Sequence, residues 1–196
     1  MLNLRKITQE ELNEIIENHQ HYLNKDCAGW EKMRADLSYM DLSYMDLSYA
    51  DLRYANLDHA NLFATSLNHA NLSYTRLSYT NLAFADLYYA DLTDADLSYS
   101  SLFHAYLYHT YLSNAILDHT DLSYADLSYA SLFHVNLSYA KLCHVNLTST
   151  FLYHADLTNV QHDNSVSFSP AQFPEKEPVI GYKRQDEKII KLQIEE

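Results

Sequence analysis

The residues in this chain that could carry chemistry are mainly its 11 histidines. His134 and His154 stand 20 positions apart, and His162 follows shortly after them. Neutral imidazole is a common zinc ligand, so a fold that brings the first two side by side could let them share a metal ion. Two ligands on an open surface make an incomplete site, however, and we expect these rings simply to stack. The histidines therefore predict no cofactor and no functional metal.

A second candidate is the pair Cys143 and His144, which has the ingredients of an activated thiol. Adjacent outward side chains on a turn generally diverge, so we expect no reactive role for this pair. The only other cysteine, Cys27, is far away in the sequence. Two cysteines are too few for a disulfide scaffold, and the N-terminus has no apolar leader. Since no apolar run is long enough to span a membrane either, we expect a cytoplasmic protein with free thiols.

Motifs that support catalysis are absent from the sequence. Gly29 and Gly181 are the only glycines, which rules out a glycine-rich phosphate loop. There is no Gly-x-Ser-x-Gly elbow, no His-Glu-x-x-His helix and no Cys-x-x-Cys pair. Most aspartates recur at one repeat position, where we expect each carboxylate to accept hydrogen bonds at a corner of the chain. We therefore expect that the chain is not an enzyme.

The charge balance restricts the choice of partner. The chain has 13 Lys and Arg residues against 26 Asp and Glu residues, a formal net charge of −13. Nucleic-acid binding needs clustered cations to neutralise phosphates, and docking on an anionic membrane surface needs them too. We therefore expect neither direct nucleic-acid binding nor membrane association.

The elements that must position these residues follow from a five-residue repeat. Leucine occupies every fifth position from Leu37 to Leu157, which makes 25 leucines without a gap. A small or apolar residue lies two positions before each leucine, and Asp or Asn often lies one before it. Five residues turn an α-helix by about 500° and end on the opposite face of a strand, so neither element keeps the leucines together. The chain must bend once per repeat to return every leucine to one interior.

The repeated units Ala-Asp-Leu-Ser-Tyr and Ala-Asn-Leu-Ser-Tyr resemble the Ala-(Asp/Asn)-Leu-x-x unit of the pentapeptide repeat proteins. The resemblance covers about residues 34–160. It implies an all-β solenoid, a right-handed quadrilateral parallel β-helix with four pentapeptides per coil, and therefore about six coils. The leucine and the small residue before it would point inward, and the other three residues outward. On this geometry His134 and His154 lie on one face in adjacent coils, roughly 4.8 Å apart.

The segment before the repeats predicts a helix that covers the first coil. Thr8 and Glu11 have the spacing of a capping box. Apolar side chains then follow on one helical face over residues 9–24. That face consists of Leu12, Ile15, Ile16, His19 and Leu23. Trp30, in the connection to the repeats, is expected to pack there too.

The segment after the repeats has a different character. Residues 165–178 hold all three prolines and predict an irregular connection. Residues 179–182 and 189–194 predict the two strands of a β-hairpin around a turn at 184–187, and this hairpin could mediate homodimerisation. Phe168 and Phe173 could seal the coil beneath it. The predicted organisation is thus a capping helix with its connection over 1–33, the β-helix over 34–160, and a linker with the hairpin over 161–196.

Aromatic residues dominate the predicted outer surface. The position two after the leucine is Tyr or His in 19 of 25 repeats. Given 20 residues per coil, this position should form one ladder of Tyr39, His59, Tyr79, Tyr99, His119 and Tyr139, and another of Tyr49, His69, Tyr89, His109 and Tyr129. The ladders can stiffen the column, and they can also form a partner-binding surface. The candidate partner-binding residues are Phe63, Phe84, Tyr88, Phe103, Tyr106, Tyr108 and Tyr111.

Two functions fit these observations. The first is a non-enzymatic structural or protein-interaction module, whose rigid acidic rod presents aromatic ladders to an unknown protein. The second is implied by the family resemblance, since some pentapeptide repeat proteins inhibit or protect DNA gyrase by imitating the shape and charge of duplex DNA. Residues 34–160 carry 13 acidic and 4 basic side chains, which is compatible with such an imitation.

Overall fold

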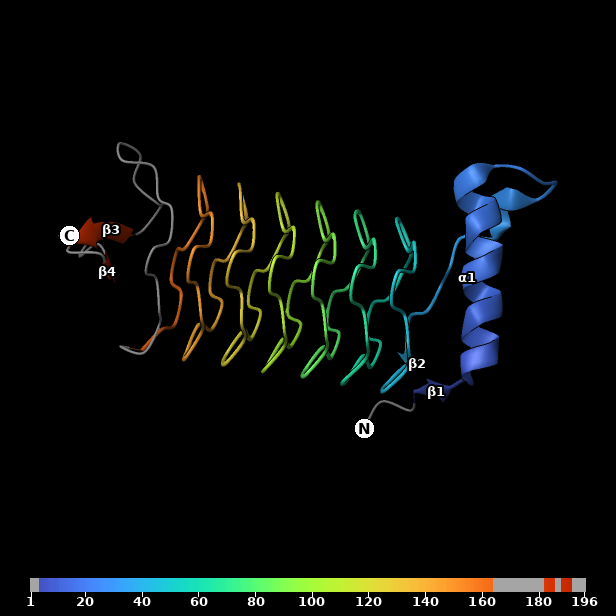
Figure 1. The fold of residues 1–196 in the computed structure, drawn as a ribbon, viewed down its shortest axis with the longest axis horizontal. Coiled ribbons are helices and arrows are strands. Elements are labelled where there is room, and N and C mark those ends of the chain that lie inside the picture. The colour runs from blue at the N-terminus through green and yellow to red at the C-terminus, as the bar shows by residue number, and fades with distance from the viewer. Residues whose placement is uncertain (1–3, 164–181, 186–187, 192–196) are drawn as a thin grey trace.

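The computed structural model describes residues 4–163, 182–185 and 188–191 (Figure 1). Strand β1 (Arg5–Lys6) comes first, followed by helix α1 (Gln9–Asn24), a short 3-10 helix (Trp30–Lys32) and strand β2 (Met40–Asp41). A column of repeats continues from there, and strands β3 (Tyr182–Gln185) and β4 (Lys188–Lys191) come last. None of the helices in these ranges is both long and apolar enough to cross a membrane.

Each five-residue unit contains one turn and one point of contact with the next coil. The turn is closed by a bond such as that from the Met40 N–H to the Leu37 carbonyl, at 3.3 Å. The residue before each leucine forms a parallel bridge to the residue 20 positions later, from Asp36 and Asn56 through to Lys141 and Gln161. Twenty residues are four units, so the coil has four sides. The turns leave too little extended chain for long strands, and most of the expected parallel sheet consists of single bridges.

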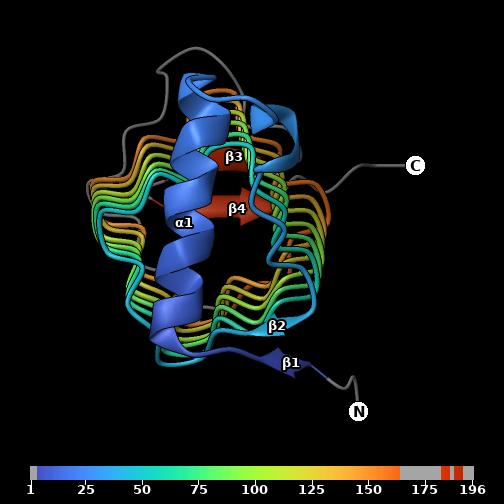
Figure 2. The ribbon, with the colours of Figure 1, turned by 90° about the vertical axis from the view of Figure 1, so that its right-hand side faces the viewer.

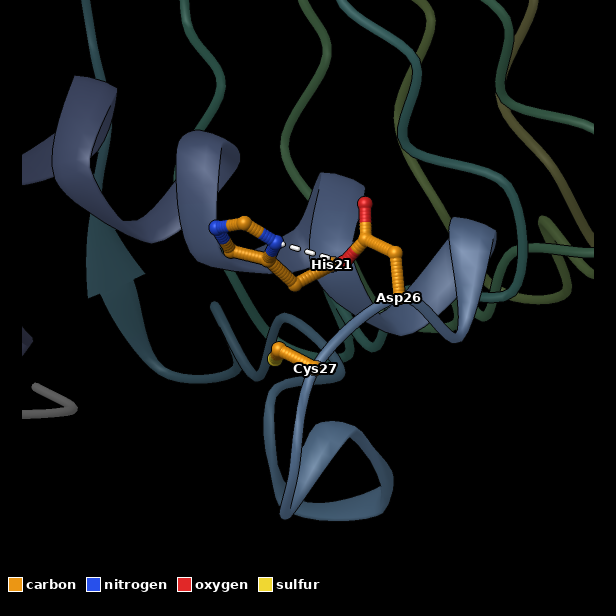
Figure 3. Close-up of side chains that lie close together, drawn as sticks. All are labelled: His21, Asp26 and Cys27. Atoms are coloured by element: carbon orange, nitrogen blue, oxygen red, sulfur yellow. Dashed lines mark hydrogen bonds and ion pairs between the residues drawn. The ribbon is translucent and has the colours of Figure 1, made fainter.

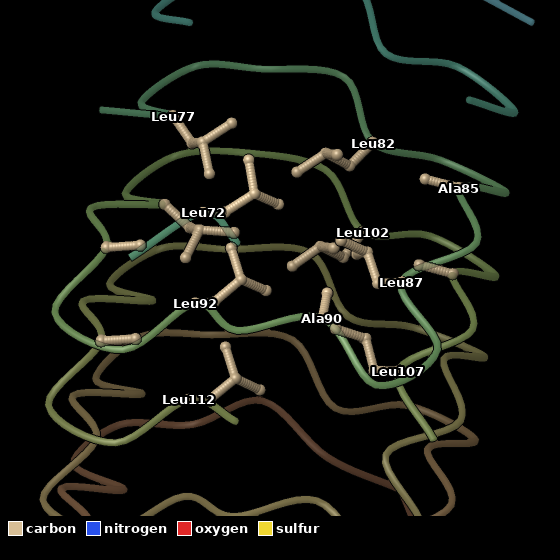
Figure 4. Packing of buried hydrophobic residues seen from close by; sticks show 14 of the residues in the cluster. Leu72, Leu77, Leu82, Ala85, Leu87, Ala90, Leu92, Leu102, Leu107 and Leu112 are labelled. Carbon is tan, nitrogen blue, oxygen red and sulfur yellow. The ribbon is translucent and has the colours of Figure 1, made fainter. Parts of the chain in front are cut away.

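The interior of the column is a stack of leucines. All 25 repeat leucines are at most 3% exposed, and they lie directly above one another from coil to coil (Figure 4). Burying a leucine side chain contributes about 1.5–3 kcal/mol, so this stack supplies most of the stability of the column. The position two before the leucine is also buried, except at the partly buried Met45, and its threonines donate their hydroxyls to leucine carbonyls, as Thr110 does to Leu87 at 3.0 Å.

The corners of the coil use a backbone conformation that usually requires glycine. The residue two after each leucine has a positive φ in all 25 repeats, from 53° at Ala64 to 65° at Tyr54, and none of these residues is glycine. The left-handed region costs an L-residue about 1–2 kcal/mol. Side chains before the leucine support the corner, since Asp46 accepts the N–H of Ser48 at 2.9 Å. The expected role of these aspartates as corner acceptors is confirmed.

Helix α1 lies across the end of the column (Figure 2). The helix predicted over residues 9–24 is confirmed, and Thr8 and Glu11 form both bonds of the capping box. Leu12 and His19 are fully buried, while Ile15 and Ile16 pack against the leucine core. Trp30 is partly buried, and its ring lies 5.9 Å from that of Tyr22 in α1.

Two features at the ends of the chain differ from the sequence-based expectation. Strand β1 pairs in parallel with β2, which the sequence did not indicate because two charged residues carry no strand signal. Strands β3 and β4 form the expected antiparallel pair, but the predicted turn at 184–187 is wrong. Arg184 and Gln185 belong to β3, since Arg184 pairs with Ile189 and Gln185 with Lys188. Phe168, Phe173 and the predicted connection over 165–178 lie outside the described residues.

Candidate functional site

The outer faces of the column carry continuous stacks of aromatic rings. In the ladder from Tyr39 to Tyr139, successive ring centroids are 4.6–5.0 Å apart and the planes differ by 6–16°. In the ladder from Tyr49 to Tyr129 the separations are 4.7–5.3 Å. Both predicted ladders are confirmed. We call them the first ladder and the second ladder.

The stacks explain how the corners tolerate their strained backbone. Each ring of a ladder sits on a residue with positive φ, and its stacking with one neighbour contributes about 0.5–1.5 kcal/mol beyond burial. This contribution is similar to the cost of the left-handed conformation. A third stack joins Phe84, His104, Tyr124 and His144, with centroids 4.5–5.1 Å apart. The aromatic residues thus stabilise the corners at which they stand.

Four of the seven residues predicted to bind a partner line one groove. Its volume is about 490 Å³, and it lies between the third stack and the second ladder. The aromatic side chains in it are Phe84, Tyr88, Tyr106 and Tyr108. Tyr88 and Tyr108 stack at 5.6 Å and line one side of the groove. Tyr106 is 57% exposed, so a partner can reach its ring.

The other three predicted residues border this groove or lie in a second one. Phe63 and Phe103 contact Phe84 edge to face, at 5.5 and 6.0 Å. Tyr111 lines a neighbouring groove of about 450 Å³, whose other aromatic residues are His109, Tyr129, Phe133 and Phe151. Tyr108 of the first groove meets Tyr129 of the second at 5.4 Å. The two grooves therefore border the second ladder and form one continuous aromatic surface.

Sequence reasoning missed part of this surface. Phe133 and Phe151 line the second groove, and Tyr153 stacks on Phe133 at 5.3 Å. The signal that could have found them is present, because each ring stands directly before or after a repeat leucine. This is the same placement that singled out Phe103 and Tyr106.

The aromatic surface lies within an acidic column. Asp86 lines the first groove, and its carboxylate also accepts the Tyr88 N–H at 3.1 Å. In another repeat, the hydrogen bond from the Ser43 hydroxyl lowers the pKa of Asp41. Three of the four basic residues of the repeats lie beside aspartates, in the pairs Arg53–Asp51, Arg76–Asp58 and Lys141–Asp121. The 13 acidic residues therefore leave a large negative excess.

The structure also places the residues that were considered for chemistry. His134 and His154 stack at 4.6 Å with planes 4° apart. The His144 ring stacks on Tyr124 at 4.5 Å, and its Nε2 lies 3.2 Å from the Asp163 carboxylate. The neighbouring Cys143 is partly buried. His162 is exposed, beyond the last repeat leucine.

One chemical cluster was not anticipated. His21, Asp26 and Cys27 come together at the end of α1 (Figure 3), with one potential ligand atom from each lying within 4.8 Å of the others. Sequence analysis overlooked them because they lie outside the repeats and match no common metal-binding spacing. They form the only group of three or more such residues found in the part of the chain that the structure describes.

A period of five, four units per coil and a stacked leucine interior define a four-sided solenoid of pentapeptide repeats. The family model of pentapeptide repeats matches in eight copies, over residues 33–68, 65–98, 100–138 and 125–161. The chain belongs to the pentapeptide repeat family, whose members are right-handed quadrilateral β-helices and are generally structural modules rather than enzymes.

Several solved structures resemble this chain. HetL, a pentapeptide repeat protein involved in heterocyst differentiation regulation in the cyanobacterium Nostoc, is 28% identical, with 70% of this chain and 73% of HetL covered and a TM-score of 0.40. Rfr23 from the cyanobacterium Cyanothece is 24% identical, with 68% and 87% covered and a TM-score of 0.40. QnrB1, a plasmid-mediated fluoroquinolone resistance protein, is 17% identical, with 66% and 84% covered and a TM-score of 0.34. No curated protein sequence matches the chain significantly.

Proposed function

We propose that this chain is a non-enzymatic protein-interaction module of the cytoplasm, which binds its partner through the two aromatic grooves. The observation that carries the proposal is the continuous aromatic surface on both sides of the second ladder. Exposed apolar patches on soluble proteins usually mark a contact surface, and tyrosine is enriched in the cores of protein interfaces. The contact residues are Phe63, Phe84, Tyr88, Phe103, Tyr106, Tyr108 and Tyr111.

The charge of the column indicates which kind of partner fits. Asp86 lines the first groove, and the surrounding repeats have 13 acidic and 4 basic residues. A partner segment with Arg or Lys beside apolar side chains would place its cations near Asp86 and its apolar groups on the rings. Arginine would add stacking on tyrosine faces. The partner is therefore a basic segment of another protein.

Removing three rings of the first groove tests this function. The variant Tyr88→Ala, Tyr106→Ala, Tyr108→Ala should lose capture of the partner in a pull-down, and the purified pair should then bind at least about tenfold more weakly, since each ring at an interface core is worth 1 kcal/mol or more. The matched control is Tyr79→Ala, Tyr99→Ala, Tyr139→Ala, which removes three rings from the first ladder. Circular dichroism verifies that both variants are folded. Full binding by the groove variant would contradict the proposal.

The proposal extends to the ends of the column. We propose about six coils, from 25 units at four per coil, and α1 as the cap of the first coil, which the packing of its apolar residues on the leucine core supports. We propose the corresponding division into 1–33, 34–160 and 161–196. The β3–β4 hairpin is proposed to mediate a homodimer, since a two-stranded hairpin alone is marginally stable. A sedimentation experiment that finds only monomer at tens of micromolar would contradict the dimer.

Acidic imitation of DNA is the second candidate function, and the excess of ionised carboxylates on the repeats favours it. A supercoiling assay with bacterial DNA gyrase at low and high salt tests it. Inhibition at stoichiometric protein that weakens with salt would support imitation, because added ions screen exposed charges. Unchanged supercoiling at tens of micromolar protein would exclude gyrase as the target. The groove variant keeps every carboxylate, so it should inhibit normally if charge is the cause.

A further inference from the structure

The chain reverses direction at the end of α1 and brings three different ligand types together. Lys25, the C-cap residue, has φ 55° and ψ 37°, in the left-handed region. This turn carries Asp26 and Cys27 back toward His21 in the last helical turn (Figure 3). The His21 Nδ1 lies 2.7 Å from the Asp26 Oδ1, and the ligand atoms of all three residues lie within 4.8 Å of one another. An imidazole, a carboxylate and a thiol thus face one small volume.

This combination of donors matches zinc better than other common ions. Zinc accepts nitrogen, sulfur and carboxylate oxygen at about 2.0–2.3 Å, whereas magnesium and calcium prefer oxygen alone. A tetrahedral site with these bond lengths places its ligand atoms about 3.5 Å apart. The separations in the cluster, from 2.7 Å to at most 4.8 Å, lie on both sides of this value, and side-chain rotation can bring them to it. We propose that His21, Asp26 and Cys27 bind one Zn²⁺ ion, with water as the fourth ligand.

Zinc binding at this cluster changes the protonation of its ligands. The ion takes the place of the proton between His21 Nδ1 and Asp26, that proton moves to His21 Nε2 so that the ring stays a neutral imidazole, and the Cys27 thiol releases its own proton to solvent. Two anionic ligands and one neutral imidazole then neutralise the two positive charges of zinc. The bound ion would fasten the connecting segment to the helix at a point where the main chain has only a turn.

The surroundings of the cluster favour a cation. The cluster lies at the C-terminal end of α1, where the helix dipole is negative. The nearest lysine in sequence, Lys25, places its ammonium over the Trp30 ring at 5.3 Å. Cys27 is partly buried, and its thiol donates to the Met33 sulfur at 3.7 Å.

Titration of untagged, reduced protein with Co²⁺ tests the site, because cobalt reports its ligands through its absorption. We expect one equivalent to produce a thiolate-to-cobalt band in the near ultraviolet together with intense tetrahedral bands in the visible, and one equivalent of Zn²⁺ to remove both. Loss of a residue that only supports a metal ligand already costs about 10–100-fold in affinity. Cys27→Ser should therefore abolish the thiolate band and weaken zinc binding at least about 100-fold.

The second cysteine supplies the matched control. Cys143→Ser should keep the full cobalt spectrum, whereas loss of the band in this variant would assign the binding to Cys143 and His144 instead. Asp26→Asn should keep the thiolate band but bind zinc more weakly, and His21→Gln should do the same. Circular dichroism verifies that each variant is folded. Absence of a thiolate band in the wild-type protein, or its persistence in Cys27→Ser, would overturn the proposal.

Discussion

The corner residue of each repeat combines a strained backbone with a stacked side chain. Twenty-five consecutive corners have positive φ, and none of them uses glycine. Asn and Asp adopt this conformation more readily than tyrosine, yet most corners carry Tyr or His. Ring stacking along the column accounts for this choice, because it stabilises by about as much as the backbone conformation costs.

Two glycine substitutions separate these contributions. Ala64→Gly removes a strained residue without a ring, so it should raise the free energy of unfolding by up to about 1 kcal/mol. Tyr99→Gly gives the same relief but removes the stacks on Tyr79 and His119, at 5.0 and 4.6 Å. It should therefore lower the free energy of unfolding, by about 2 kcal/mol relative to Ala64→Gly. Urea unfolding followed by circular dichroism measures both, and equal stabilisation by the two changes would show that the ladders contribute nothing.

Sequence reasoning was uneven at the residue scale. It predicted the ladders, because a period of 20 places Tyr79 next to Tyr99 whatever the details of the corner. It could not predict the positive φ of those corners, since no glycine marks them. It also missed the cluster of His21, Asp26 and Cys27, because their proximity depends on the left-handed conformation of Lys25. Conformation at a single non-glycine residue has little signature in one sequence.

At the scale of elements, α1 is joined to the column through a buried histidine. His19 is fully buried, its Nδ1 accepts the Ala35 N–H at 3.1 Å, and its Nε2 lies 3.0 Å from the Arg53 carbonyl. The Nδ1 must be unprotonated to accept, so the neutral ring is the form that fits. Burial lowers the pKa of His19 below its usual value of 6.5, against the opposing effect of the Arg53 carbonyl.

This arrangement predicts that acid weakens the attachment of α1. With the folded pKa below the unfolded one, the stabilisation by His19 is complete above pH 6.5 and is lost as the pH falls from there through the folded value. Urea unfolding between pH 7.5 and pH 5 should show a decline in wild type that is smaller in His19→Gln. The pKa of Asp41 is lowered from 3.8, so its own contribution is lost only at still lower pH. An identical decline in both proteins would contradict the role of His19.

The elements themselves were predictable where local signals were strong. The capping-box spacing of Thr8 and Glu11 predicted where α1 begins, and the apolar face from Leu12 to Leu23 predicted its length. Strand β1 had no such signal, because its pairing with β2 depends on contact between distant segments. The predicted end of β3 was wrong because the polar residues Arg184 and Gln185 were assigned to the turn. Polar residues can still pair in an antiparallel sheet, as these two do.

At the scale of the whole molecule, the column is a set of interchangeable coils. The leucine period alone predicted a solenoid, whereas the four-sided section depended on family resemblance until the bridges between residues 20 apart established it. Because every unit buries the same kind of residue, one coil can replace another in the core. The coils are not interchangeable on the outer surface, since each groove combines side chains from neighbouring coils.

Two deletions distinguish the core from the surface. Removal of residues 41–60 takes out one complete coil and leaves every downstream side chain on its original face, so both the fold and partner binding should persist. Removal of residues 96–100 preserves the leucine pattern but rotates Tyr106 and Tyr108 by one face relative to Phe84 and Tyr88. This protein should fold, as circular dichroism can verify, and bind at least about tenfold more weakly. Undiminished binding after the five-residue deletion would show that the first groove is not the contact surface.

The ladders have an optical consequence as well. Trp30, the only tryptophan, lies beside α1 at one end of a column that carries many tyrosines, some of them in stacked pairs such as Tyr54–Tyr74 at 5.1 Å and Tyr79–Tyr99 at 5.0 Å. Excited tyrosines at such separations exchange energy, and tryptophan, which absorbs at longer wavelength, is the natural acceptor. We therefore expect excitation energy absorbed by the tyrosines to be transferred to Trp30, at the end of the column where α1 is attached. The unlabelled protein thus contains both the energy donors, its tyrosines, and the acceptor, Trp30. Detachment of α1 can be followed as a loss of tryptophan fluorescence excited through tyrosine.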